Sequence, residues 1–164
     1  MPTIPRRWPI EVESEREEAI RSANEAAQIL QKAQATLDSA RAKVNAHQSF
    51  ALVLVTDTER YLADALTRTE RVRRYLSVAR SKSINGRWPQ GVSRQREEAE
   101  EALDRAIDLL YDGERGLAPL REKVTKNPAL CDAMIADLSL ALARSLNQIE
   151  RVVRLLTEAG LGRG

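Results

Sequence analysis

The sequence lacks the residues that build metal centres and disulfides. It has one cysteine, Cys131, and one histidine, His47, among 164 residues. One cysteine forms no intramolecular disulfide, and the pair falls short of the four ligands of a structural zinc site. Di-iron sites in helical bundles need Glu-x-x-His on two helices, and this motif is also absent. We therefore expect no metal and no cofactor.

Motifs of catalysis are missing as well. We expect Cys131 to be a small buried residue and His47 to lie in a turn between helices, so neither is a candidate nucleophile or base. The segments GERG and GRG lack the preceding strand and the Lys-Ser/Thr of a phosphate-binding loop. The sequence therefore predicts that the protein is not an enzyme.

Long apolar segments are also absent. The longest run is FALVLV, Phe50 to Val55, whereas a membrane-spanning helix needs about 20 residues. The N-terminal stretch MPTIPRRWP has two arginines but no apolar segment behind them, unlike a signal peptide. We expect no membrane insertion, and a protein of the cytoplasm or of a soluble assembly.

What the sequence does contain is charge and helix-forming residues. Charged residues make up 30% of the chain and aromatic residues 4%, with seven glycines and six prolines. This balance is typical of a soluble helical protein. The length suits one domain that buries roughly 70% of its unfolded surface.

The chain repeats itself. Aligning it with itself at an offset of 80 residues, without a gap, gives 25 identities in 84 pairs, including Trp8 with Trp88 and Arg16-Glu17-Glu18-Ala19 with residues 96–99. Such self-similarity indicates one unit used twice. We expect residues 1–81 to form an N-terminal arm and a helical hairpin, and residues 82–164 a connector and a second hairpin, with both halves in one structural domain.

Each unit has the apolar periodicity of two long helices. In the first helix, residues from Ala19 to Val44 recur at alternating steps of four and three, the seam spacing of a coiled coil. The last helix carries a broad apolar stripe from Ile135 to Leu156. The predicted fold is all-α, an elongated four-helix bundle of two tandem hairpins, with an end-to-end arrangement as the alternative.

Capping signals place the helices at about 14–46, 49–81, 93–125 and 128–159. Ser14 with Glu17 fits a capping box, and Asn127-Pro128 fits an N-cap followed by proline at the first helical position. Pro119, with two glycines nearby, predicts a kink or a break in the third helix, because proline removes a hydrogen bond and clashes with the preceding turn.

The N-terminal arm and the connector share an Ile, a Trp and a Pro, at Ile4/Ile84, Trp8/Trp88 and Pro9/Pro89. Prolines oppose helix, so both segments are predicted to be extended straps. We expect the two tryptophans to anchor equivalent places on the core, with a partner-binding role as the alternative.

The segment from Arg60 to Arg87 contains eight basic residues and two acids. Such a face attracts phosphates, although pairs such as Glu70 with Arg74 are typical of a solvated, self-compensating helix surface. The candidate polyanion contacts are Arg60, Arg68, Arg71, Arg74, Arg80, Lys82 and Arg87.

Two repeated polar residues, Arg41 and Asp57, lie nearly level across the first predicted hairpin, as do their copies Arg121 and Asp137. We interpret them as ion pairs that set the register of each hairpin rather than as catalytic groups. Exposed pairs of this kind contribute about 0.2 to 1 kcal/mol.

The two copies differ in apolar content at their turns. The first has Phe50, Leu52 and Val53 within a run that is apolar on every side of a helix, while the second has Asp132 and Ala133 opposite Leu52 and Val53. We predict that Phe50, Leu52 and Val53 form an association surface, unless the arm or the other hairpin buries them. Replacing Leu52 and Val53 by Asp and Ala is expected to abolish association and preserve helicity.

These features favour a non-catalytic structural or adaptor protein that acts through helix-face contacts in a larger assembly, such as a virion or a multi-subunit machine. Its expected partner is another protein or a second copy of itself. The alternative is a nucleic-acid or polyanion-binding helical module that uses the basic segment. Salt separates the two, because binding to phosphates weakens steeply with salt.

Overall fold

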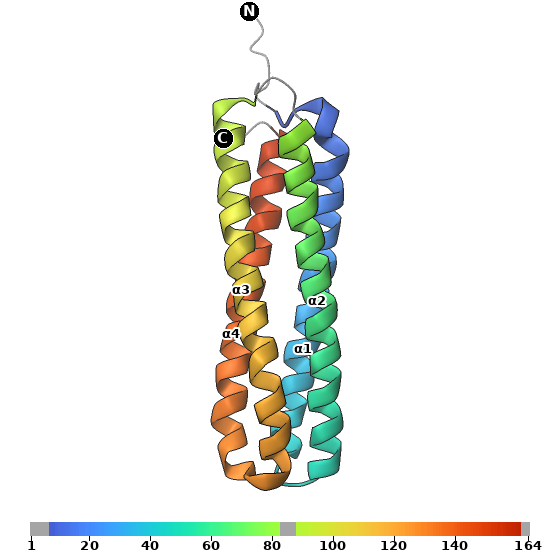
Figure 1. The fold of residues 1–164 in the computed structure, drawn as a ribbon, viewed down its shortest axis with the longest axis vertical. Helices are drawn as coiled ribbons and strands as arrows, with labels where there is room; N and C mark the ends of the chain where they lie inside the picture. Colours follow the sequence, from blue (N-terminus) through green and yellow to red (C-terminus); the bar gives the residue numbers. More distant parts are fainter. Residues whose placement is uncertain (1–6, 83–87, 162–164) are drawn as a thin grey trace, which may run out of the picture.

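The computed structural model describes residues 7–82 and 88–161. Four long helices run along one axis (Figure 1). A short 3-10 helix, Ile10–Val12, leads into them, and the described residues contain no strand; the four are α1 (Glu13–Lys43), α2 (Gln48–Lys82), α3 (Gln90–Lys126) and α4 (Pro128–Leu161). The all-α four-helix bundle predicted from the repeat is confirmed.

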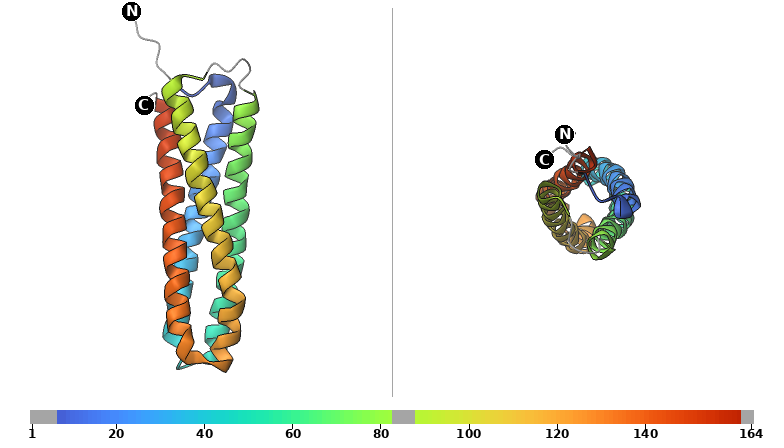
Figure 2. Two further views of the ribbon diagram at one scale, coloured as in Figure 1. Left: turned by 60° about the vertical axis from the view of Figure 1, so that its left-hand side comes forward. Right: turned by 90° about the horizontal axis from the view of Figure 1, so that it is seen from above.

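The two hairpins lie side by side, which excludes the end-to-end arrangement. Both interhelix turns are at one end of the rod, and the start of α1 and the end of α4 are at the other (Figure 1). Each helix of one hairpin packs against one helix of the other, α1 against α4 and α2 against α3. Consequently α2 and α4 occupy opposite corners of the bundle (Figure 2).

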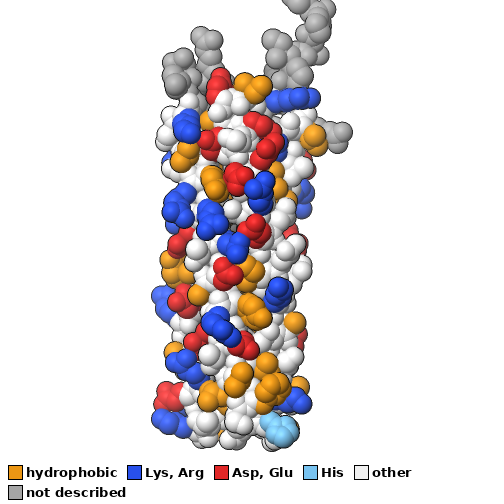
Figure 3. Space-filling view, turned by 90° about the vertical axis from the view of Figure 1, so that its right-hand side faces the viewer, with side chains coloured by type: hydrophobic (Ala, Val, Ile, Leu, Met, Phe, Trp, Pro, Cys, Tyr) orange, Lys and Arg blue, Asp and Glu red, His pale blue; other side chains and the backbone are white. Residues whose placement is uncertain are grey.

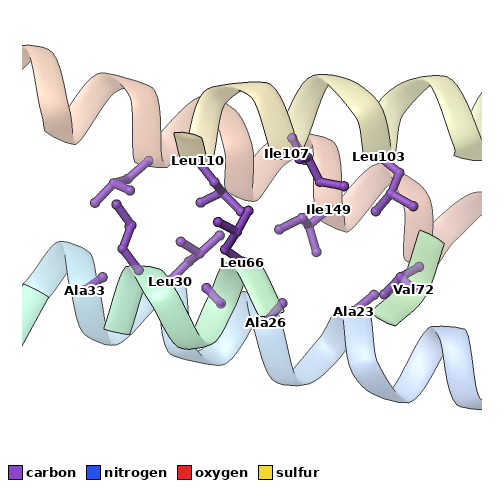
Figure 4. Close-up of a cluster of buried hydrophobic side chains, with 14 of the residues drawn as sticks. Ala23, Ala26, Leu30, Ala33, Leu66, Val72, Leu103, Ile107, Leu110 and Ile149 are labelled. Atoms are coloured by element: carbon purple, nitrogen blue, oxygen red, sulfur yellow. The ribbon is translucent and has the colours of Figure 1, made fainter. Parts of the chain in front are cut away.

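One continuous apolar core runs along the bundle, and all four helices contribute to it. Alanines of α1 face leucines and isoleucines of α3 and α4 (Figure 4). Ala26, Leu30, Leu110 and Ile149 are each at most 1% exposed. Small side chains on α1 leave room for large ones on the opposite hairpin, as close packing requires.

The first hairpin brings polar residues into this core, whereas the second is apolar at the same positions. Thr58 and Thr69 are each 1% exposed, and their copies are Leu138 and Ile149. Both threonine hydroxyls donate to carbonyls one turn earlier on α2, at 2.9 and 2.7 Å. Each buried hydroxyl is therefore satisfied within its own helix.

The helix starts differ in part from the predicted caps. α4 begins at Pro128 directly after Asn127, as predicted. The capping box at Ser14 is wrong, because α1 already begins at Glu13 after a 3-10 turn, and the Ser14 hydroxyl donates to the Glu15 carboxylate instead. The 3-10 turn therefore precedes α1 at the point where the sequence predicted a capping side chain.

Of the kink or break predicted in the third helix, the break is wrong. α3 is one helix from Gln90 to Lys126 with Pro119 inside it. Pro119 is exposed, so the carbonyl that it leaves without a donor faces solvent. Gly113 and Gly116 face α2 and α4, where an added Cβ would lie 3.3 Å from Leu62 and 2.8 Å from Leu138. The glycines allow close helix packing rather than a turn.

The predicted register pairs within each hairpin are not formed. Arg41 binds Asp132 of α4, with Nε 2.5 Å from Oδ1, and Arg121 binds Glu59 of α2 at 2.9 Å. Asp57 pairs with Arg60 on its own helix. The repeated arginines therefore connect the hairpins to each other, and the Arg41 guanidinium holds the pKa of Asp132 below its usual range.

Candidate functional site

The predicted association surface lies on α2, at the end of the bundle that carries the turns. Phe50 is 49% exposed and Val53 is 54% exposed, while Leu52 is half-buried against the core. Figure 3 shows hydrophobic side chains gathered at this end, next to the histidine. We call Phe50, Leu52 and Val53 the turn-end surface.

The alternative, that the arm or the second hairpin buries this surface, does not hold for Phe50 and Val53. The described part of the arm packs at the opposite end, where the Trp8 backbone N–H donates to the Ala159 carbonyl at 3.1 Å. The Lys43 ammonium lies 6.0 Å from the centre of the Phe50 ring. A cation at this distance from an aromatic face adds weak attraction and leaves the ring accessible.

The two tryptophans meet each other rather than occupying separate equivalent places. Their ring centroids are 4.5 Å apart in an edge-to-face arrangement. Trp8 is 3% exposed and donates from Nε1 to the Val12 carbonyl at 2.9 Å, whereas Trp88 is half-buried. The core-anchor interpretation fits Trp8, and the pair closes the end of the bundle opposite to the turns.

Beside Trp88 lies a cluster of charged side chains, in which Arg96 is buried and Arg80 is exposed. The Arg96 guanidinium stacks 4.5 Å above the Trp88 ring, and its side chain is 9% exposed. Its Nε lies 3.7 Å from the Glu100 carboxylate, too far for a hydrogen bond. Arg80 approaches the same carboxylate from α2 at 3.5 Å. Burial raises the pKa of Glu100, and the two arginines oppose this only in part.

This shift predicts a pH dependence of stability. The pKa of the Glu100 carboxyl is higher in the folded protein than in the unfolded chain, where it is about 4.3. The free energy of unfolding therefore falls as the pH rises from this unfolded pKa through the raised one. Glu100→Gln removes the ionisation, so this variant should be more stable than the wild type at pH 7. Below pH of about 4 the difference should vanish. Urea unfolding at a series of pH values measures this difference, and an equal effect of the substitution at all pH values would contradict the prediction.

The predicted polyanion contacts divide into two groups. Four of them have acidic partners: Arg60 with Asp57, Arg68 with Glu25 and Asp64, Arg80 with Glu100, and Lys82 with Glu15. Arg71 and Arg74 have no ion pair or hydrogen bond among the described residues, and Arg87 lies outside them. The predicted pair of Glu70 with Arg74 is not formed, and Glu70 instead accepts from the Tyr111 hydroxyl at 2.5 Å.

The two residues considered for metal or nucleophilic chemistry differ in their exposure. His47 is exposed in the turn before α2, and Cys131 is fully buried, which raises the pKa of its thiol. Within residues 7–82 and 88–161, no three His, Cys, Asp or Glu side chains are placed to hold a metal ion.

No helix of the described chain is both long and apolar enough to span a bilayer. Comparison of the chain with protein-family models, with curated proteins and with solved structures finds no match.

Proposed function

We propose that the chain is a non-catalytic structural or adaptor protein that binds another protein or a second copy of itself through the turn-end surface. The observation that carries this proposal is the exposure of Phe50 and Val53, each about half accessible on a helix whose other face is fully packed. Clustered exposed apolar side chains of this kind are characteristic of interaction sites.

The difference between the copies supports the same proposal. The residues opposite Leu52 and Val53 in the second hairpin are Asp132 and Ala133, both exposed. Asp132 takes part in the ion pair with Arg41 that joins the hairpins. At the positions of Leu52 and Val53 the second turn thus carries a polar contact of the fold and a small side chain. At the position of Phe50 both turns are apolar, because its counterpart Leu130 is 47% exposed.

The test uses substitutions that leave the core intact. Because Leu52 is partly buried, Phe50→Ser with Val53→Ser is a sharper variant than one that alters Leu52. Burying the exposed halves of these two side chains stabilises a complex by about 2 kcal/mol, so the variant should lose roughly 30-fold in affinity. Sedimentation equilibrium measures self-association, and cross-linking with mass spectrometry in the native source identifies partners attached at Lys43.

A matched control is Leu140→Ser, because Leu140 is 50% exposed on α4 outside the turn-end surface. The control should associate as the wild type does. Undiminished association of the Phe50/Val53 variant, or an equal loss in the Leu140 variant, would overturn the proposal.

The alternative of a polyanion-binding module is less favoured by the charges. Most of the candidate contacts on α2 have acidic partners. An arginine whose charge is balanced by a neighbouring carboxylate adds little to the electrostatic potential that attracts a polyanion. Binding of a nucleic-acid duplex that weakens steeply between low and high salt would support this alternative instead.

A further inference from the structure

The unpaired arginines of α2 are the ones that the second hairpin repeats. Of the seven basic residues of α2, five have acidic partners within 4.0 Å: Arg60, Arg68, Arg73, Arg80 and Lys82. None of these five is basic at the corresponding position of the second copy. Arg71 and Arg74, which have no partner among the described residues, are retained as Arg151 and Arg154.

The second pair is also without partners. Arg151 and Arg154 on α4 make no ion pair or hydrogen bond within the described part of the chain, although Glu150 is their sequence neighbour. Arg144 on α4 is unpaired too, but its counterpart is Asp64, so it is not part of the repeated feature. The ion pairs that stabilise the bundle thus differ between the copies, while the copies share two arginines that make no ion pair or hydrogen bond among the described residues.

Each pair forms a compact cationic site. Residues three apart on a helix have Cβ atoms about 5 to 6 Å from each other on one face, so two guanidinium groups can bind the same acidic group or two adjacent ones. Arg74 and Arg154 are exposed, and Arg71 and Arg151 are half-buried. Guanidinium groups bind carboxylates with two parallel hydrogen bonds, which gives such sites directional specificity.

The two pairs lie on opposite sides of the rod. α2 and α4 are at diagonal corners, each packed against α1 and α3, so their exposed faces point away from each other. We propose that Arg71 with Arg74, and Arg151 with Arg154, are two equivalent docking sites for an acidic protein segment, and that one chain binds two such segments at once.

Charge and geometry favour an acidic protein segment over a nucleic acid. Strong binding to a duplex draws on about six to ten phosphate contacts, whereas each repeated pair supplies two arginines with a glutamate beside them, and the unpaired Arg144 adds only one more on α4. One duplex reaches only one of two opposite faces, but two separate segments reach both. These sites are distinct from the turn-end surface, so their test is independent of the proposed function.

The experiment titrates the full-length protein with a synthetic helical peptide of about 20 residues that carries glutamates at i, i+3 and i+4 positions. Isothermal titration calorimetry gives the stoichiometry, and amide chemical shifts locate the contact. We expect two peptides per chain, one per chain for Arg71→Gln/Arg74→Gln and for Arg151→Gln/Arg154→Gln, and none for the fourfold variant.

The matched control is Arg60→Gln/Arg73→Gln, which removes the same charge from two ion-paired positions of α2. This variant should still bind two peptides, and the same peptide with glutamine in place of glutamate should not bind. The proposal is overturned by a stoichiometry of one, by no binding, by binding to the fourfold variant, by an equal loss in the control, or by tighter binding of a DNA duplex of the same length than of the peptide.

Discussion

Replacing Pro119 by alanine should raise the free energy of unfolding by about 2 kcal/mol. Proline inside a helix is about 3 kcal/mol less favourable than alanine, and up to about 1 kcal/mol is returned because alanine makes the unfolded chain more flexible. Pro119 lies well inside α3 and is exposed, so alanine restores the hydrogen bond to the Arg115 carbonyl without altering the core. Urea unfolding followed by circular dichroism measures the change.

Pro128→Ala is the matched control. Pro128 is the first residue of α4, where its missing N–H would have no partner in the helix and its fixed backbone angle suits the helix start. This variant should be unchanged or slightly less stable, by about 0.4 to 1 kcal/mol. A destabilised Pro119→Ala protein would contradict the uninterrupted α3.

Leu110→Ala should lower the free energy of unfolding by about 2 to 5 kcal/mol, and the copy position Leu30→Ala should do the same. Both leucines are 0% exposed. They come from different hairpins, and the two hairpins face each other across the core (Figure 4). Truncation removes buried apolar surface and leaves a cavity that the surrounding helices fill only in part. Equilibrium unfolding of both variants gives the two values.

Leu140→Ala provides the comparison, because Leu140 is 50% exposed and its truncation should change stability by less than about 0.5 kcal/mol. Two separate hairpins would melt in two steps, with each leucine variant shifting only one of them. A single transition shifted by both variants is the result expected of a shared core.

The repeat and the seam periodicity were sufficient to predict the four helices and their order. The residues that recur every three or four positions, from Ala19 to Val44, are those that the structure buries. Burial is set by helix periodicity, which a local stretch of sequence contains. The predicted boundaries differ from the observed ones by up to three residues, because caps depend on side-chain contacts that the periodic pattern does not specify.

Contacts between the hairpins could not be predicted in this way. The partners of Arg41 and Arg121 lie on the other hairpin, so they depend on which helices become neighbours in the bundle. The tolerance of Pro119 likewise depends on its position on the exposed face of α3. The sequence shows only a proline with two glycines nearby, and this composition predicts a kink or a break.

The candidate surfaces, like the fold, could be predicted from the sequence only in part. The apolar composition of the turn predicts an association surface at Phe50, Leu52 and Val53, and the structure leaves Phe50 and Val53 about half exposed. In the sequence the basic segment is one continuous feature, whereas the structure separates ion-paired arginines from unpaired ones. The offset of 80 residues retains Arg71 and Arg74 as Arg151 and Arg154, but the sequence alone does not show which arginines have an acidic partner in the fold.

The most direct test of a single bundle of two side-by-side hairpins is the distance between their turns. Spin labels at Ala46 and Lys126, both exposed, can be introduced as cysteines in a Cys131→Ala background and measured by pulsed electron spin resonance in protein diluted with unlabelled chains. Diagonal helix axes in a bundle lie within about 15 Å, so with the label arms we predict a distance below about 30 Å. A distance beyond about 50 Å, the length of one helix, would show the hairpins end to end and contradict the account.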